Sequence, residues 1–302
     1  MTGASGLVGR ALCQALAKEA VPFCVLSRDP RRALRLVPSA RSYHLWQPLE
    51  RAGAWAALAR GARAIVHLAS PLLASGRWDD ARRQALYDAC VIGTRGVISA
   101  VAQASERPDV LICASTVAFY AYDARGIVVS TEEDGAGGDF LSRLAADWEA
   151  EAMRAEQFGV RTVLLRTALV LGAGGALPRL RQAARLGLGA GPAPGTQRQP
   201  WIHVDDEVGL LLHALADDGL RGPVNAVAPD AVTSAEFMGT LSGLLGTPPG
   251  LRSPRWLLRS RFGAGAVMVT HGRGAAPARA LELGYEFRQP ALEAALRRAL
   301  AA

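Results

Sequence analysis

Lysine is almost absent from this chain of 302 residues, in which Lys18 is the only one and arginine carries nearly all of the positive charge. The lack of lysine excludes a common catalytic arrangement, in which a lysine lowers the pKa of a tyrosine that exchanges a proton with the substrate. The net charge of +7 comes from scattered arginines with no aromatic residues interleaved among them. We therefore expect no nucleic-acid partner.

Cysteine is scarce and long apolar runs are missing. Cys13, Cys24, Cys90 and Cys113 have no metal-type spacing and lie in apolar segments, which predicts buried free thiols and neither a metal site nor disulfides. No apolar run approaches the roughly 18 residues needed to cross a bilayer, and no signal peptide precedes the first motif. We expect a cytoplasmic protein without a membrane partner.

A glycine-rich turn opens the chain. Residues 2–9 read Thr-Gly-Ala-Ser-Gly-Leu-Val-Gly, with the spacing G-x-x-G-x-x-G. Glycine is needed where a Cβ would block a tight turn, a close ligand or a contact between helix and sheet. The free N–H groups and the dipole of the helix that follows attract a diphosphate. The turn predicts a bound dinucleotide, and the alternative is a simple tight turn. The predicted contacts here are Gly3, Ser5, Gly6, Leu7, Val8 and Gly9.

Arg28 follows an apolar segment at the place where the ribose of a dinucleotide lies. Proteins that bind NAD usually place an acid there, whereas an arginine can hold a 2′-phosphate through two charge-assisted hydrogen bonds. We therefore predict that NADP(H) is preferred over NAD(H). Asp29 is the alternative, because a shift of one residue would bring its carboxylate to the ribose hydroxyls.

Short apolar runs alternate with helical segments over residues 1–171. We expect strands at 21–26, 42–46, 64–68, 110–114 and 162–167, and helices at 54–60, 79–104 and 140–158. This alternation predicts an α/β fold with a doubly wound parallel sheet of the Rossmann type. Only Met1 precedes the glycine turn, so the first strand looks truncated, and we expect about five more residues in the natural protein.

The pattern changes after Leu171. Stretches rich in glycine and proline lie at 172–175 and 187–200, and the rest is mostly helical, with short strands expected near Val224 and at 285–288. We divide the chain into an NADP-binding Rossmann domain at 1–171, elements of a substrate lobe at 172–248 and a smaller C-terminal helical domain at 249–302. The loops 3–9, 28–32, 68–78, 115–122 and 167–178 should converge at the carboxyl ends of the strands.

Five motifs follow one another in a familiar order: residues 2–9, 67–69, 115–120, 165–172 and 201–206. They resemble the motifs of the extended short-chain dehydrogenase/reductase superfamily. The stretches 77–78, 139–141, 147–149, 174–177, 222–229 and 277–296 are similar to its atypical epimerase-family branch. That branch is often labelled sugar-nucleotide epimerase or cell-division-inhibitor-like, and it carries its own C-terminal helical domain. Further predicted cofactor contacts at strand ends are Leu68, Ala69, Ser70, Arg166 and Thr167.

The resemblance places the tyrosine and lysine of the usual catalytic helix at Leu141 and Ala145, so this chain lacks the pair. Among the remaining groups, Tyr120 with Thr116 or Ser115 is the best candidate for handling a proton, because these residues follow a predicted strand. The alternative is that Tyr120 packs on the nicotinamide side with its hydroxyl capping a loop.

His203 is the next candidate for carrying a proton, and its alternative is a structural hydrogen bond near Asp205 and Asp206. The resemblance implies an NADP(H)-binding protein of the NAD(P)-dependent epimerase/dehydratase type. We hypothesise an oxidoreductase or epimerase reaction on an unknown small molecule by a nonstandard proton path. The rival hypothesis is a noncatalytic protein whose C-terminal lobe presents an NADP(H)-dependent surface to a partner. The sequence is compatible with a homodimer.

Overall fold

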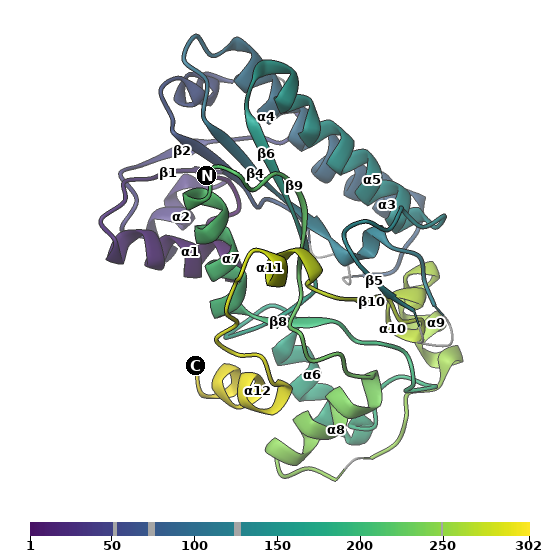
Figure 1. Ribbon diagram of the computed structural model, residues 1–302. Helices are drawn as coiled ribbons and strands as arrows, with labels where there is room; N and C mark the ends of the chain where they lie inside the picture. The colour runs from purple at the N-terminus through teal and green to yellow at the C-terminus, as the bar shows by residue number, and fades with distance from the viewer. Residues whose placement is uncertain (51–52, 72–75, 124–127, 249) are drawn as a thin grey trace.

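A parallel sheet with helices on both faces forms the N-terminal part of the molecule (Figure 1). The computed structural model describes residues 1–302 except 51–52, 72–75, 124–127 and 249. The strands of the sheet are β1 (Cys24–Ser27), β2 (Ser42–Leu45), β3 (Ala64–His67), β4 (Val110–Thr116), β6 (Arg161–Thr167) and β9 (Gly222–Ala226). All pair in parallel, which confirms the predicted Rossmann-type sheet.

Residues 1 and 2 connect β1 with β3 in the middle of this sheet. Thr2 forms parallel bridges to Leu26 on one side and to His67 on the other. The Leu26 N–H donates to the Met1 carbonyl oxygen at 2.8 Å, and the Thr2 N–H donates to the Val66 carbonyl oxygen at 3.0 Å. The strand order is therefore β2, β1, residues 1–2, β3, β4, β6, β9, and the glycine turn lies at the carboxyl edge.

Helices cover both faces of the sheet (Figure 1). One face carries α1 (Leu7–Lys18), α2 (Pro30–Leu36) and α7 (Val204–Ala216), and the other carries α3 (Asp80–Tyr87), α4 (Gly93–Gln103) and α5 (Phe140–Met153). Successive side chains of a strand point to opposite faces. Leu111 and Cys113 of β4 accordingly pack in the core under α5, and Val110 and Ile112 pack in the core under α1 and α7.

Residues Asp80–Gln103 form one continuous helix of 24 residues, in which a short π-helical turn joins α3 to α4. By length and by a mean hydropathy of 1.3 it could cross a membrane, but 56% of the apolar window is buried inside the protein. Leu86, Val97 and Val101 of this helix belong to the core cluster beneath α5. Its apolar character is therefore explained by packing against the sheet.

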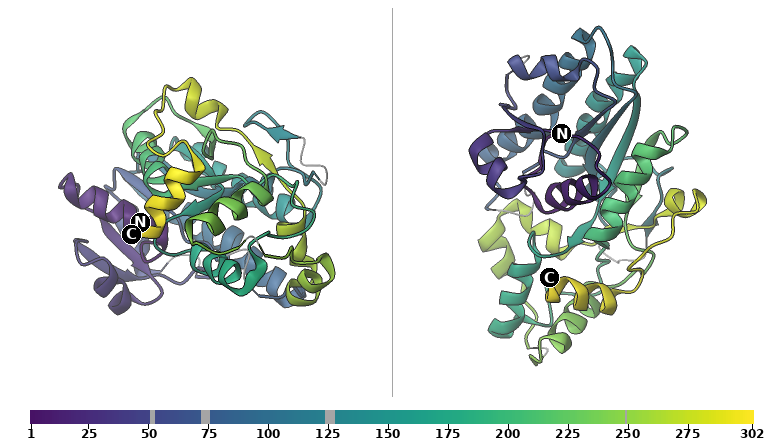
Figure 2. Two further views of the ribbon diagram at one scale, coloured as in Figure 1. Left: turned by 90° about the horizontal axis from the view of Figure 1, so that it is seen from below. Right: turned by 90° about the vertical axis from the view of Figure 1, so that its left-hand side faces the viewer.

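A second lobe lies beyond the carboxyl ends of the strands (Figures 1 and 2). It is built around the paired strands β7 (Leu169–Leu171) and β8 (Trp201–His203) with the helices α6 (Leu177–Ala183), α8 (Ser234–Leu244) and α12 (Leu292–Ala301). Trp201, Phe237 and Leu296 fill its separate core. The remaining elements are β5 (Val129–Ser130), α9 (Arg255–Phe262), α10 (Val267–Thr270), β10 (Gly274–Ala275) and α11 (Ala278–Glu282).

The strand expected at 285–288 is wrong. The backbone N–H groups of Arg288 and Gln289 donate to the carboxylate of Asp206 at 2.6 and 3.0 Å. This segment is therefore bonded to a side chain of α7, and it pairs with no strand among the described residues. An alternation of apolar and polar residues identifies an extended backbone, but it does not show which acceptor the backbone will meet.

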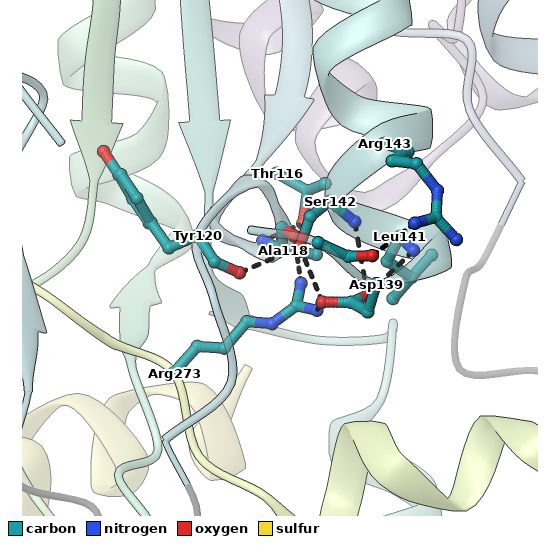
Figure 3. A network of polar contacts seen from close by, with 9 residues as sticks. Thr116, Ala118, Tyr120, Asp139, Leu141, Ser142, Arg143 and Arg273 are labelled. Atoms are coloured by element: carbon teal, nitrogen blue, oxygen red, sulfur yellow. Dashed lines mark hydrogen bonds and ion pairs between the residues drawn. The ribbon is translucent and has the colours of Figure 1, made fainter. Parts of the chain in front are cut away.

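Arg273 fastens the C-terminal part of the chain to the start of α5 (Figure 3). Asp139 caps this helix by accepting hydrogen bonds from the N–H groups of Leu141 and Ser142. The Arg273 guanidinium donates to the same carboxylate at 2.7 Å, and it also donates to the carbonyl oxygen of Ala118 in the loop after β4. One buried cation therefore joins the C-terminal part of the chain to the edge where the predicted site lies.

Candidate functional site

The glycine turn is close-packed at two of its three glycines. Gly3 has φ +70°, and a Cβ on it would lie 2.6 Å from the carbonyl group of Leu68. A Cβ on Gly9 would lie only 2.2 Å from the Gly3 carbonyl oxygen. Gly6 differs, because the nearest atom to a Cβ there would be the Gly3 oxygen at 3.3 Å. Packing explains Gly3 and Gly9, whereas Gly6 keeps the outer side of the turn open.

The helix that follows the turn begins with unsatisfied N–H groups. Gly6 is the N-cap of α1, no side chain caps it, and no acidic residue lies in the first turn. The first N–H groups of a helix and its dipole attract an anion, so Leu7 and Val8 can present theirs to a phosphate. This end of α1 fits the diphosphate of a dinucleotide.

Thr2 holds the end of β3 against this turn. Its hydroxyl lies 2.8 Å from His67 Nδ1 and accepts a hydrogen bond from the Ala69 N–H at 3.2 Å. Burial lowers the pKa of His67 to about 4, so the imidazole is neutral near pH 7. Leu68, Ala69 and the adjoining Ser70 thereby line the same edge as the turn, as expected for that part of the predicted site.

The end of β1 brings Arg28 to the surface. Asp29 is the N-cap of α2, where its carboxylate accepts from the Arg32 N–H at 2.9 Å. Asp29 is therefore engaged within the protein, whereas the described part of the chain provides no ion pair for Arg28. Arg28 and Asp29 were the two candidates for contacting the ribose of the dinucleotide, and this geometry favours Arg28.

A groove of about 920 Å³ lies beside the turn, between α1 and α12. Its walls carry Arg10 on α1 and Arg297 and Arg298 on α12. Arg298 pairs with Asp205 at 2.6 Å and Arg297 pairs with Glu293 on its own helix. Among the described residues, Arg10 makes a long 3.4 Å bond to the Gly6 carbonyl oxygen and no ion pair. Arg10 was not among the predicted contacts, although its position directly after the third glycine places it in the first turns of α1.

A buried ion pair occupies the carboxyl ends of β4 and β6. Arg166 donates from Nε and Nη2 to the two carboxylate oxygens of Glu149 at 2.9 and 2.8 Å, and its side chain is only 4% exposed. The Ser115 hydroxyl donates to the same carboxylate at 2.5 Å. Arg166 and Ser115 were predicted to serve the cofactor and the proton, but their polar groups are directed into this pair. The structure therefore favours a structural role for both.

Tyr120 belongs to the same network. Its side chain is 1% exposed, and its hydroxyl donates to Asn225 Oδ1 at 2.7 Å and accepts from Arg166 Nη1 at 2.9 Å. Burial raises the pKa of Tyr120, so the phenol is a poor base near neutral pH. The Arg166 guanidinium also stacks over the Phe119 ring at 3.6 Å. These contacts support the alternative, a packed tyrosine, over Tyr120 as a proton carrier.

His203 also has a structural place. It is the N-cap of α7, where Nδ1 accepts from the Asp205 N–H at 3.1 Å. The side chain is buried, and burial lowers its pKa. Because the Nδ1 lone pair is engaged by the backbone, it is not free to take up a proton from a substrate, so this geometry favours the structural alternative here too.

The opposite face of the same strand ends carries two threonines. Thr116 and Thr167 are direct partners in the parallel pairing of β4 with β6, and both are half-buried. Thr167 donates its hydroxyl to Glu207 Oε1 at 2.7 Å. Glu207 on α7 is 1% exposed, its Oε2 has no hydrogen-bond partner among the described residues, and burial raises its pKa to about 8.

Glu207 was not among the residues predicted from the sequence, where only its neighbours Asp205 and Asp206 were considered beside His203. A signal was present. Glu207 lies one helical turn after His203 and one turn before Leu211, which are both buried, so the helical period places it on the inward face. A carboxylate at such a position is unusual and marks a site of interest.

The chain belongs to the NAD dependent epimerase/dehydratase family, whose profile matches residues 1–226. A domain of unknown function, DUF1731, matches residues 253–299. This agrees with the resemblance to extended short-chain dehydrogenases/reductases that carry a C-terminal domain of their own.

Particular relatives cover almost the whole chain. The epimerase family protein SDR39U1 of Homo sapiens is 32% identical over 303 residues, which span 99% of this chain and 98% of the relative. The epimerase family protein Mb2239 of Mycobacterium bovis is 36% identical over 98% of this chain and 95% of the relative. A crystal structure of human SDR39U1 with NADPH matches with a TM-score of 0.86 at 29% identity, over 99% of this chain and 98% of that one.

Alanine at Gly9 and at Gly6 should have different effects. Gly9→Ala drives a Cβ into the Gly3 carbonyl and should lower the free energy of unfolding by roughly 1 to 3 kcal/mol. Gly6→Ala should fold with nearly parental stability but weaken NADPH binding about tenfold or more, because the Cβ stands where the diphosphate approaches. Thermal melts and calorimetric titration separate the two effects, and unchanged NADPH affinity in Gly6→Ala would argue against this phosphate site.

Removal of the Tyr120 hydroxyl should act on stability. In Tyr120→Phe, Arg166 Nη1 loses a buried acceptor and Asn225 Oδ1 loses a buried donor. The free energy of unfolding should therefore fall by about 2 kcal/mol. Tyr122→Phe is the matched control, because the described residues offer the Tyr122 hydroxyl no hydrogen bond. Urea denaturation measures both variants, and equal losses would contradict the role given to Tyr120.

Proposed function

We propose that this protein binds NADP(H) in preference to NAD(H) and uses it in an oxidoreductase or epimerase reaction on a small molecule. The observation that carries the proposal is the open N-terminus of α1 behind Gly6. At the end of β1, Arg28 is exposed and has no ion pair with the described residues. The relative crystallised with NADPH supports the choice of cofactor. The site residues present fit a dinucleotide with a 2′-phosphate.

The residues at the strand ends define what the protein can contribute. Bound NADP(H) would supply the hydride acceptor or donor. The hydroxyls of Thr116 and Thr167 can orient a carbinol or carbonyl oxygen at the carboxyl edge. Leu141 and Ala145 are buried and apolar at the places of the usual tyrosine and lysine, so the proton must take another path.

The second candidate is a noncatalytic protein that shows an NADP(H)-dependent surface to a partner. Helix α9 buries none of its residues, and Trp256 is 71% exposed on it. No acidic residue lies between Glu236 and Glu282 in the sequence, whereas α9 alone carries three arginines. An exposed aromatic residue among unopposed cations is typical of an interaction surface.

Arg28 tests the cofactor preference. Arg28→Ala should weaken NADPH binding by about 2 kcal/mol and leave NADH binding almost unchanged, because only NADPH has the 2′-phosphate that the guanidinium would hold. Calorimetry with both cofactors measures the difference. Arg35→Ala, at the far end of α2, is the control. Equal affinity of the parental protein for NADPH and NADH would refute the preference.

Limited proteolysis distinguishes the two candidates. If the lobe responds to the cofactor, NADPH should change the rate at which trypsin cleaves after Arg255, Arg259 and Arg261 in α9 by about threefold or more, since proteolysis follows local opening. The same comparison on Arg28→Ala should show a smaller change. A cleavage rate that is independent of NADPH would leave no support for the regulatory candidate.

A further inference from the structure

Two hydroxyls and one carboxyl group lie together on one face of the sheet. Thr116 and Thr167 are paired in register, and neighbouring strands in a parallel sheet direct registered side chains to the same face. Ser115 and Arg166, one residue earlier on each strand, meet Glu149 on the other face. The threonines therefore face α7, from which Glu207 reaches the Thr167 hydroxyl at 2.7 Å.

Glu207 is enclosed and only partly bonded. Its side chain is 1% exposed, Oε1 accepts from Thr167, and Oε2 has no partner among the described residues. A buried carboxyl oxygen without a partner is costly for stability, so its presence requires an explanation. Thr167 itself is half-buried and lies at the carboxyl edge, where ligands of such sheets bind.

The charged groups around Glu207 are engaged with other partners. On α7, Asp205 pairs with Arg298, and Asp206 accepts from the backbone of residues 288 and 289. Tyr285 approaches from the C-terminal segment and donates its hydroxyl to the Asp206 carbonyl oxygen at 3.2 Å. Helix α1 contributes Leu12 and Leu16 to the core that it shares with α7. Thr167 is therefore the polar group that links Glu207 to the edge.

We propose that Thr167 and Glu207 form the proton path that replaces the missing tyrosine and lysine, with Thr167 touching the reacting oxygen and Glu207 holding the proton. This inference rests on the proposed function and adds its acid–base residues. The raised pKa of Glu207, about 8, means that the carboxyl group can take or give a proton near neutral pH.

The step balances in both directions. In oxidation, bound NADP⁺ would accept the hydride from the C–H bond of a carbinol, and the O–H proton of the carbinol passes to the Thr167 oxygen. The hydroxyl proton of Thr167 moves at the same time to the Glu207 carboxylate. The products are a carbonyl compound, NADPH and a protonated Glu207, and reduction reverses each transfer.

The test needs no substrate, because NADP⁺ and NADPH differ by the positive charge of the nicotinamide. A positive charge near Thr167 should lower the pKa of Glu207 and release a proton. From a pKa of about 8, a decrease of about one unit gives release of about half a proton per NADP⁺ at about pH 7.5. NADPH should release far less. Calorimetric titration in buffers of different ionisation enthalpy counts these protons.

Substitutions show which residue releases the proton when the cofactor binds. Glu207→Gln should bind both cofactors yet abolish the difference in proton release, whereas Glu282→Gln on the surface should preserve it. Thr167→Val should reduce the release, because ionised Glu207 loses its hydrogen-bond donor, and Thr167→Ser should restore it. A Glu207 remote from the nicotinamide would not respond to the cofactor's charge.

The outcomes separate this inference from the function on which it rests. Equal proton counts for NADP⁺ and NADPH, or a difference that survives Glu207→Gln, would overturn the proton path while leaving cofactor binding intact. Failure of the parental protein to bind either cofactor would overturn both proposals. If Glu207→Gln does not fold, the pair Thr167→Val and Thr167→Ser decides, since the inference requires loss and rescue of the release.

Discussion

The ion pair between Arg166 and Glu149 is the interaction on which the carboxyl edge of the sheet depends. It joins the ends of β4 and β6 to α5, it receives the Ser115 hydroxyl, and it holds the phenol of Tyr120 in place. Buried charges destabilise a protein when their partner is lost, so every group in this network is fixed by the others. The result is one rigid, closed face at the edge where a ligand is expected.

The side chains on that closed face determine which side chains lie on the opposite face of the sheet. Because Arg166 and Ser115 point toward α5, the period of two along a strand turns Thr116 and Thr167 toward α7. The polar groups that can act on a ligand at this edge are therefore the hydroxyls of the two threonines and the carboxyl group of Glu207. The C-terminal part of the chain is held at the same edge by Arg273, which donates to Asp139, the N-cap of α5, so one C-terminal side chain supports both the helix and the approach to the site (Figure 3).

The sequence predicted what depends on local pattern, and it failed where long-range contacts decide. The principal strands, the glycine turn and the family follow from apolar period and motif order, and the structure and comparisons confirm them. The strand at 285–288 failed because the carboxylate of Asp206, far away in sequence, captures that backbone. Arg166 was predicted to contact the cofactor, whereas its guanidinium is bonded to Glu149, and motif position alone does not reveal the direction of a side chain. Glu207 was not predicted, since its enclosure depends on the packing of α7 against the sheet and only its neighbours Asp205 and Asp206 had been considered.

A crystal structure of the protein with NADP⁺ tests the central claim most directly. The account predicts that the diphosphate lies on the N–H groups of Leu7 and Val8, that Arg28 contacts the 2′-phosphate, and that the nicotinamide lies at the ends of β4 and β6 beside Thr167. A dinucleotide that leaves the N–H groups of Leu7 and Val8 without contact, or a nicotinamide remote from both threonines, would contradict it.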